Sequence, residues 1–154
     1  MVAQSGILAA MFAALTVAAP ASNLVQRAGG PVAKPIPDTC TVDDPYESST
    51  SAPSAFIPAA SSSEIQLYAM YYPPYTSNST QMAQQCLEQC YGYGDSTECK
   101  GAYWANQVLV PEGYYGSGTL ETACVFYTRA LAADDLVAAP EGQGTDAKAR
   151  NIVC

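Results

Sequence analysis

The sequence predicts a small α+β domain in which disulfides hold one helix against several short strands. Three observations support this fold class. The chain of 154 residues contains six cysteines, and one segment repeats apolar residues every four positions, as one face of a helix requires. Several other segments are rich in aromatic and β-branched residues and end at proline or glycine, which is typical of strands.

Residues 1–21 are predicted to be a secretory signal peptide. Residues 6–19 are apolar and uncharged, and Ala19-Pro20-Ala21 has the small-x-small pattern that signal peptidase cleaves. The apolar stretch is shorter than the ~20 residues that cross a bilayer, and no later segment is long and apolar enough. The segment lacks a preceding Lys or Arg, and a buried N-terminal helix is the alternative interpretation. We expect a secreted, extracellular protein without a membrane span, and Gln26-Arg27 is a candidate second cleavage site.

Residues 22–63 are predicted to form an extended or mobile arm that carries Cys40. From residue 29 onward this segment consists largely of Pro, Ala, Ser and Thr and has little apolar periodicity. Such a composition cannot bury enough surface to offset the entropy of ordering the chain. We therefore expect the folded domain to comprise residues 64–154, with one disulfide from Cys40 tying the arm to it.

The first elements of the folded part are a strand and a helix. Residues 65–72 are rich in β-formers and precede Pro73-Pro74, which predicts a strand that ends there. Residues 76–80 supply helix N-cap candidates, and residues 81–90 contain good helix formers without Gly or Pro. Met82, Cys86 and Cys90 recur every four residues and make one apolar stripe. The helix is expected to end within residues 91–94.

The later elements are predicted to be strands and turns. Residues 102–110 and 122–128 have strand composition, and the glycine-rich turn at residues 113–118 lies between them, so the two strands are expected to form a hairpin. Residues 134–146 are predicted to be a loop. Residues 151–154 are predicted to be a short final strand.

The cysteines are predicted to form three disulfides, because a secreted small chain uses an even cysteine set as a covalent framework rather than as a zinc site. Cys86 and Cys90 lie one helical turn apart on the same face, with roughly parallel Cα–Cβ bonds, so they should not bond each other. Each must reach a different strand or loop. The other pairings stay open at this point.

The cysteine order resembles that of PAN/apple domains. The matching residues are Cys86 and Cys90 on the helix, then Cys99, then Cys124 in a following strand, with Cys40 and Cys154 outermost. The resemblance covers residues 64–154 and implies a disulfide-stapled, curved antiparallel sheet with one central helix packed on it. It also implies the nested pairs Cys40–Cys154, Cys86–Cys124 and Cys90–Cys99. The composition is similar to that of small secreted proteins of filamentous fungi.

The charge and residue inventory excludes several function classes. The chain contains no histidine, which removes Ser-His and Cys-His nucleophile sites and most zinc hydrolases. A net charge of −8 argues against a nucleic-acid partner, because affinity for phosphates comes from Lys and Arg. The spacing of the acidic residues selects no catalytic pair and misses a calcium loop. We expect no metal and no cofactor.

The aromatic residues are the most informative candidates for a binding site. The candidate ligand-binding residues are Tyr103, Trp104, Tyr114 and Tyr115. Sugar rings stack on exposed aromatic faces, and Tyr hydroxyls supply hydrogen bonds. Strand alternation is expected to bury one of Tyr103 and Trp104, and Trp104 is the one favoured for the core. Tyr114 and Tyr115 are expected to be exposed in their turn. Asn78-Ser79-Thr80 is an N-glycosylation acceptor sequence.

These features together predict a secreted, non-catalytic binding module. The resemblance to PAN/apple domains implies either carbohydrate or another extracellular protein as the ligand. The first alternative is a small secreted carboxylate-based glycan hydrolase, which would require a convergent pair of carboxyls in a cleft. The second is a structural protein of the cell wall or surface, which would require an evenly polar surface.

Overall fold

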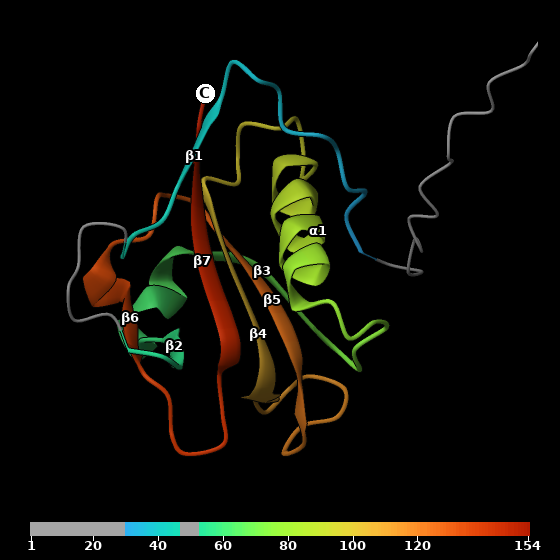
Figure 1. Cartoon of the computed structure of the whole chain (residues 1–154), viewed down its shortest axis with the longest axis vertical. Coiled ribbons are helices and arrows are strands. Elements are labelled where there is room, and N and C mark those ends of the chain that lie inside the picture. Colours follow the sequence, from blue (N-terminus) through green and yellow to red (C-terminus); the bar gives the residue numbers. More distant parts are fainter. Residues whose placement is uncertain (1–29, 47–52) are drawn as a thin grey trace, which may run out of the picture.

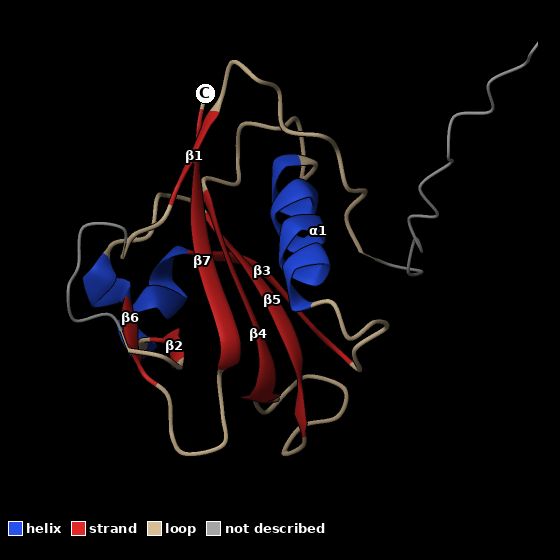
Figure 2. Cartoon of the chain, in the orientation of Figure 1, coloured by secondary structure: helices blue, strands red, loops and turns tan. Residues whose placement is uncertain are grey.

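Figure 1 shows the computed structural model of the chain, which describes residues 30–46 and 53–154. The predicted signal peptide (1–21), the candidate cleavage site Gln26-Arg27 and residues 22–29 and 47–52 of the predicted arm lie outside the described residues. Within these described residues, one α-helix, two 3-10 helices and seven strands follow one another (Figure 2). In chain order they are β1 (Thr41–Asp43), β2 (Phe56–Pro58), η1 (Ala60–Ile65), β3 (Gln66–Tyr72), α1 (Ser79–Tyr91), β4 (Gly101–Leu109), β5 (Leu120–Tyr127), η2 (Ala133–Asp135), β6 (Leu136–Ala138) and β7 (Thr145–Val153).

The strands form two antiparallel sheets, and the predicted α+β class is confirmed. The larger sheet has the strand order β1-β7-β4-β5-β3, and the smaller one pairs β2 with β6. The predicted hairpin is β4 paired with β5, with Trp104 opposite Cys124. Helix α1 lies on one face of the larger sheet, while β2, β6 and the 3-10 helices lie on the other (Figure 1).

Helix α1 has the boundaries and the buried stripe that the sequence indicates. The Asn78 side chain caps the helix by accepting a hydrogen bond from the Gln81 N–H at 3.0 Å. Met82, Cys86, Leu87 and Cys90 are the buried residues of the helix. Gly92 follows the last turn, where an added Cβ would lie 1.9 Å from the Val32 carbonyl oxygen. Glycine therefore allows residues 30–34 to run against the end of the helix.

Three disulfides connect the elements. They join Cys40 to Cys154, Cys86 to Cys124 and Cys90 to Cys99, which are the pairs that the PAN/apple resemblance implies. Cys86 and Cys90 do not bond each other, as their shared helix face predicts. Because Cys86 binds strand β5 and Cys90 binds the segment before β4, α1 is held to the sheet region at two points.

The central strands of the larger sheet, β4 and β5, are buried on both faces. On the α1 side, Trp104, Cys124 and Phe126 pack under Met82 and the helix cysteines. On the opposite side, the other side chains of β4, β5 and β7 pack against Phe56 of β2 and Leu136 of β6; those sheet residues include Tyr103, Ala105, Val125, Tyr127, Ala147 and Ala149. Strands β4 and β5 therefore contribute to two cores.

The described part of the predicted arm, residues 30–46 and 53–63, contributes two short strands to the sheets and lies against the domain. Strand β1 pairs with β7, and β2 carries the buried Phe56. The Lys34 N–H donates to the Glu88 carbonyl oxygen at 3.0 Å, which fixes residues near it against α1. Backbone hydrogen bonds and the buried Phe56 hold the described part of this segment against the domain, which the absence of apolar periodicity did not indicate.

Two C-terminal predictions also differ from the structure. The predicted loop at residues 134–146 contains the short elements η2 and β6, and β6 is ordered by pairing Leu136 with Pro58 and Ala138 with Phe56. The predicted final strand at residues 151–154 is the end of the nine-residue strand β7. Alternating Ala147 and Ala149 point into the core and give β7 a buried face despite the weak strand propensity of Ala.

Candidate binding cleft

An open cleft of about 440 Å³ lies on the face of the larger sheet opposite α1. One wall comes from β2 and η1, and the other comes from β3, β4 and the residues just after β4. The lining is mainly apolar, with polar groups from Ser62, Ser63, Gln66, Tyr71, Tyr103 and Gln143; the apolar residues are Ile57, Pro58, Ala59, Ala60, Val108, Leu109, Pro111, Val125 and Pro140.

Local backbone features place the lining residues. The β4–β5 register shifts between Ala105 and Val108, and Gln107 has a positive φ of 55°. Such a bulge breaks the alternation of a strand, and the consecutive residues Val108 and Leu109 both line the cleft. At the other end, Gly144 has φ of 62°, and an added Cβ would lie 2.6 Å from the Phe56 carbonyl oxygen. This close approach seats Gln143 and the start of β7 beside β2.

The tyrosines of the cleft are neutral hydrogen-bonding groups. The Tyr103 hydroxyl donates to the Phe56 carbonyl oxygen at 2.8 Å, and burial raises its pKa far above the ordinary value. Burial, reinforced by the nearby Tyr114, raises the pKa of Tyr71 to about 12. These hydroxyls stay protonated at neutral pH. They can orient a ligand but supply no ionised base.

The turn after β4 extends the cleft rim. The Tyr114 ring packs edge-on against Tyr71 with the ring centroids 5.0 Å apart, and the Gln66 side-chain amide lies 3.5 Å from the Tyr114 hydroxyl. Tyr114 is 38% exposed, while the neighbouring Tyr115 is fully exposed. The predicted exposure of both turn tyrosines is confirmed. Tyr114 lies at the rim of the cleft because Tyr71 and Gln66 line it.

The structure does not bring the four predicted ligand-binding residues onto one face. Tyr103 and Trp104 are both buried, on opposite sides of β4, so the expectation that one of them is at the surface is wrong. The physical reason is that the central strands β4 and β5 are covered on both faces. Tyr103 lies at the base of the cleft, whereas Trp104 packs under α1 and cannot stack on a ligand without unfolding.

Most of the cleft could not be predicted from the sequence. The lining residues come from segments far apart in the chain, and none of the following belongs to a recognisable motif: Ile57, Pro58, Gln66, Leu109 and Gln143. The pairing of β2 with β6 brings the first two residues over the sheet. A signal could have come only from the bulge after Ala105, where strand alternation ends.

Acidic side chains are not part of the cleft lining. Within residues 30–46 and 53–154, no Asp or Glu lines it, and no group of three or more Cys, Asp or Glu side chains could hold a metal ion. Asp135, from the predicted acidic loop, instead accepts two hydrogen bonds from the Arg129 guanidinium at 2.7 and 2.8 Å. Hydrogen bonding by Arg129 lowers the pKa of Asp135.

Asn78 is exposed at the N-terminus of α1, on the opposite side of the larger sheet from the cleft. Its side-chain oxygen caps the helix, while its amide nitrogen is the atom that a glycan would occupy. A glycan at this position would leave the cleft open. Its attachment stays a prediction.

Comparison of the chain with protein-family models, curated proteins and solved structures found no match. In the part of the chain that the structure describes, no helix has the length and apolar character required to cross a membrane. The three disulfides are compatible with an extracellular protein.

Proposed function

We propose that this protein is a secreted, non-catalytic binding module that holds a segment of another extracellular protein in the cleft beside β2. The observation that carries the proposal is the lining: a wide apolar trough with hydrogen-bonding groups placed at a few points. Sites of this composition bind apolar side chains, and their few polar groups fix orientation. Secretion is proposed from the predicted signal peptide, and the role as a binding module agrees with the resemblance to PAN/apple domains.

Two features support binding rather than catalysis. The chain has no histidine, and the described lining of the cleft has no carboxylate that could act as general acid or base. The tyrosines there have raised pKa values because they are buried. The hydrolase that the sequence left as an alternative would need a convergent carboxyl pair, which the lining of this cleft does not supply.

The cleft also favours a recognition role over a purely structural one. Four large hydrophobic residues are exposed at or near the end of the β4–β5 hairpin: Leu109, Tyr114, Tyr115 and Leu120. Leu109 lies opposite Leu120 in the strand register, and Leu109 also lines the cleft. Exposed apolar groups gathered in one place are typical of interaction sites. A purely structural protein would instead be expected to have an evenly polar surface.

Carbohydrate is the second candidate ligand, and the exposure of the Tyr115 ring favours it. The Tyr115 ring is fully exposed, and Tyr114 beside it packs edge-on against Tyr71 at the cleft rim. An exposed ring next to a fixed one offers a platform for the C–H face of a sugar. We rank this ligand second because the cleft itself offers few groups for the many hydroxyls of a sugar.

Selection from a random peptide library displayed on phage, with the full secreted chain as the target, tests the proposal. We expect the selected peptides to share an apolar or aromatic anchor residue. Leu109→Glu should weaken their binding about tenfold or more, because it places an unpaired carboxylate beside the apolar anchor. Val137→Glu is the matched control, because Val137 is exposed to a similar extent (45% against 47%) and does not line the cleft.

Two results would contradict the protein-binding proposal. The first is selection of peptides that bind the Leu109→Glu and Val137→Glu proteins equally well. The second is failure to select any peptide while a glycan array gives ligands whose binding Tyr115→Ala abolishes. That second pattern would establish carbohydrate as the ligand.

A further inference from the structure

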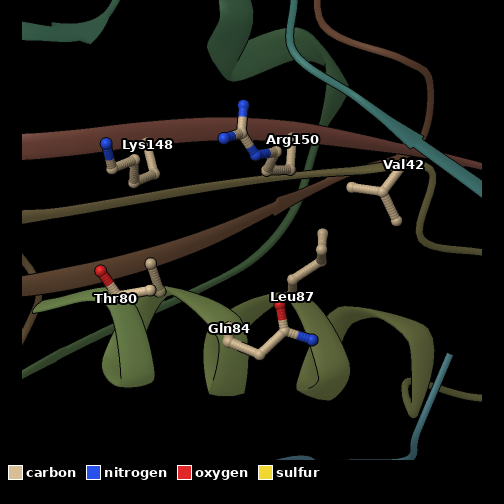
Figure 3. A pocket seen from close by; sticks show the side chains of 7 residues that line it. Val42, Thr80, Gln84, Leu87, Lys148 and Arg150 are labelled. Atoms are coloured by element: carbon tan, nitrogen blue, oxygen red, sulfur yellow. The ribbon is translucent and has the colours of Figure 1, made fainter.

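A second, separate groove lies on the α1 side of the larger sheet. Its volume is about 140 Å³, well above the ~10–15 Å³ that one buried water occupies. Figure 3 shows Thr80, Gln84 and Leu87 of α1 facing Lys148 and Arg150 of β7, with Val42 of β1 nearby. Ala83 completes the lining. This groove shares no lining residue with the cleft beside β2.

The groove gathers positive charge in an acidic protein. The chain carries 14 acidic and 6 basic residues, and two of those basic residues line this one groove. Lys148 and Arg150 are two positions apart on β7, so their side chains leave the same face of the strand, while Ala147 and Ala149 enter the core on the other face. The alternation of β7 therefore directs both cations to one surface.

The two cations differ in their availability. The Arg150 guanidinium donates to the Asp44 carboxylate, which holds it at the β1 end of the groove. Among the described residues, no hydrogen bond or ion pair involves the Lys148 side chain, which is exposed. Lys148 is thus a cation beside a groove in a molecule whose net charge repels anions elsewhere.

The other lining residues determine which chemical groups of a ligand would lie next to an anion bound by Lys148. Val42, Ala83 and Leu87 supply aliphatic surface, and Thr80 supplies a hydroxyl. Gln84 supplies an amide whose NH2 group donates to the Glu88 carboxylate at 2.9 Å. No aromatic ring lines the groove in the described part of the chain, so it lacks the stacking surface that sugar rings favour. Aliphatic surface beside a free ammonium group fits a peptide in which an acidic residue adjoins an aliphatic one.

We infer that the groove between α1 and β7 is a second binding site, which takes an acidic–aliphatic peptide segment of a partner protein. Lys148 receives the carboxylate, and the surface formed by Val42, Ala83 and Leu87 receives the aliphatic side chain. The site is independent of the cleft beside β2. A partner could occupy either site alone.

An NMR titration of the full ¹⁵N-labelled chain tests this inference. The probe is a blocked tetrapeptide of glycine, glutamate, leucine and glycine, and its control replaces the glutamate with glutamine. We expect the glutamate peptide to shift the amide signals of Thr80, Gln84 and Lys148 and to bind up to about fivefold more tightly than the control, as an exposed ion pair allows. The preference should diminish as ionic strength rises from about 0.02 M to about 0.5 M.

Two variants of equal charge change separate a site from a general charge effect. Lys148→Glu should weaken binding of the glutamate peptide about tenfold, because repulsion replaces attraction. Lys100→Glu alters the net charge equally but lies outside the groove, and it should leave the affinity within about twofold. Folding of both variants is checked by their NMR spectra.

Three results would overturn the inference. Equal binding of the glutamate and glutamine peptides would show that Lys148 receives no carboxylate. Equal loss in the Lys148→Glu and Lys100→Glu proteins would show that only net charge matters. Tighter binding of an oligouronate than of the peptide, with shifts at the same amides, would assign the groove to an acidic saccharide instead.

Discussion

The Cys40–Cys154 disulfide offers the clearest test of how the segment before Glu64 is held. It closes the longest loop in the protein's disulfide set, with a sequence separation of 114, and the chain-entropy relation gives a stabilisation of up to about 4.8 kcal/mol for a loop of this length. The same relation gives about 2.6 kcal/mol for Cys90–Cys99, whose separation is 9. Cys40 is half-buried and Cys154 is exposed, so replacing both leaves little cavity.

Replacing both residues (Cys40→Ala with Cys154→Ala) should therefore lower the free energy of unfolding by several kcal/mol without changing the fold. Equilibrium unfolding in guanidinium chloride measures the loss. The fluorescence of Trp104, the single and buried tryptophan, reports the transition. Val153→Ala is the control, because it alters the same β1–β7 pair and keeps the disulfide. A loss below about 1 kcal/mol would refute the view that this bridge restricts the unfolded chain.

Two further predictions concern single side chains. Asp135→Asn should lower the free energy of unfolding by about 1–3 kcal/mol at neutral pH. The loss should lie near the lower value, because Arg129 is half-exposed and water screens the ion pair. Because the pKa of Asp135 is lowered by its hydrogen bonds to Arg129, this contribution is complete above the ordinary Asp value of about 3.9 and is lost as pH falls through the lower folded value. Unfolding free energies measured across that acidic range should fall less steeply for the variant, and identical slopes would contradict the assignment. Asn78→Ala should cost about 1 kcal/mol through loss of the helix cap, whereas Asn78→Ser keeps a capping oxygen and should cost little. Thermal unfolding compares the two, intact mass after secretion from a eukaryotic host shows whether both lose a glycan, and equal stability of the two variants would argue against the cap.

The parts of the fold that local chemistry determines could be predicted from the sequence. The cap at Asn78 and the four-residue spacing of Met82, Cys86 and Cys90 defined α1. β-Forming residues bounded by proline or glycine defined β3, β4 and β5. In these segments the local sequence favours the same secondary structure that the folded protein adopts, so predicting them required no tertiary information.

The remaining strands depend on partners that are distant in sequence. Lys148 and Ala149 have weak strand propensity, yet they extend β7 because they pair with Trp104 and Tyr103 of β4. Strands β2 and β6 are three residues each and exist through their mutual pairing. A local sequence pattern contains no information about such a partner.

The candidate sites were less predictable than the fold for the same reason. Exposure of Tyr114 and Tyr115 followed from their glycine-flanked turn, which is a local feature. Burial of both Tyr103 and Trp104 followed from coverage of the sheet by α1 on one side and by β2 and β6 on the other. The apolar cleft arises where that second cover ends, so it could not be located before the layers were known.

We propose that the cleft beside β2 holds an apolar segment of a protein partner. The most direct measurement is chemical-shift mapping of the ¹⁵N-labelled full chain with the tightest peptide from the display selection. We expect the largest shifts on Ile57, Gln66, Leu109 and Gln143, and Leu109→Glu should remove them. Largest shifts at Thr80 and Lys148, or shifts unchanged by Leu109→Glu, would contradict it.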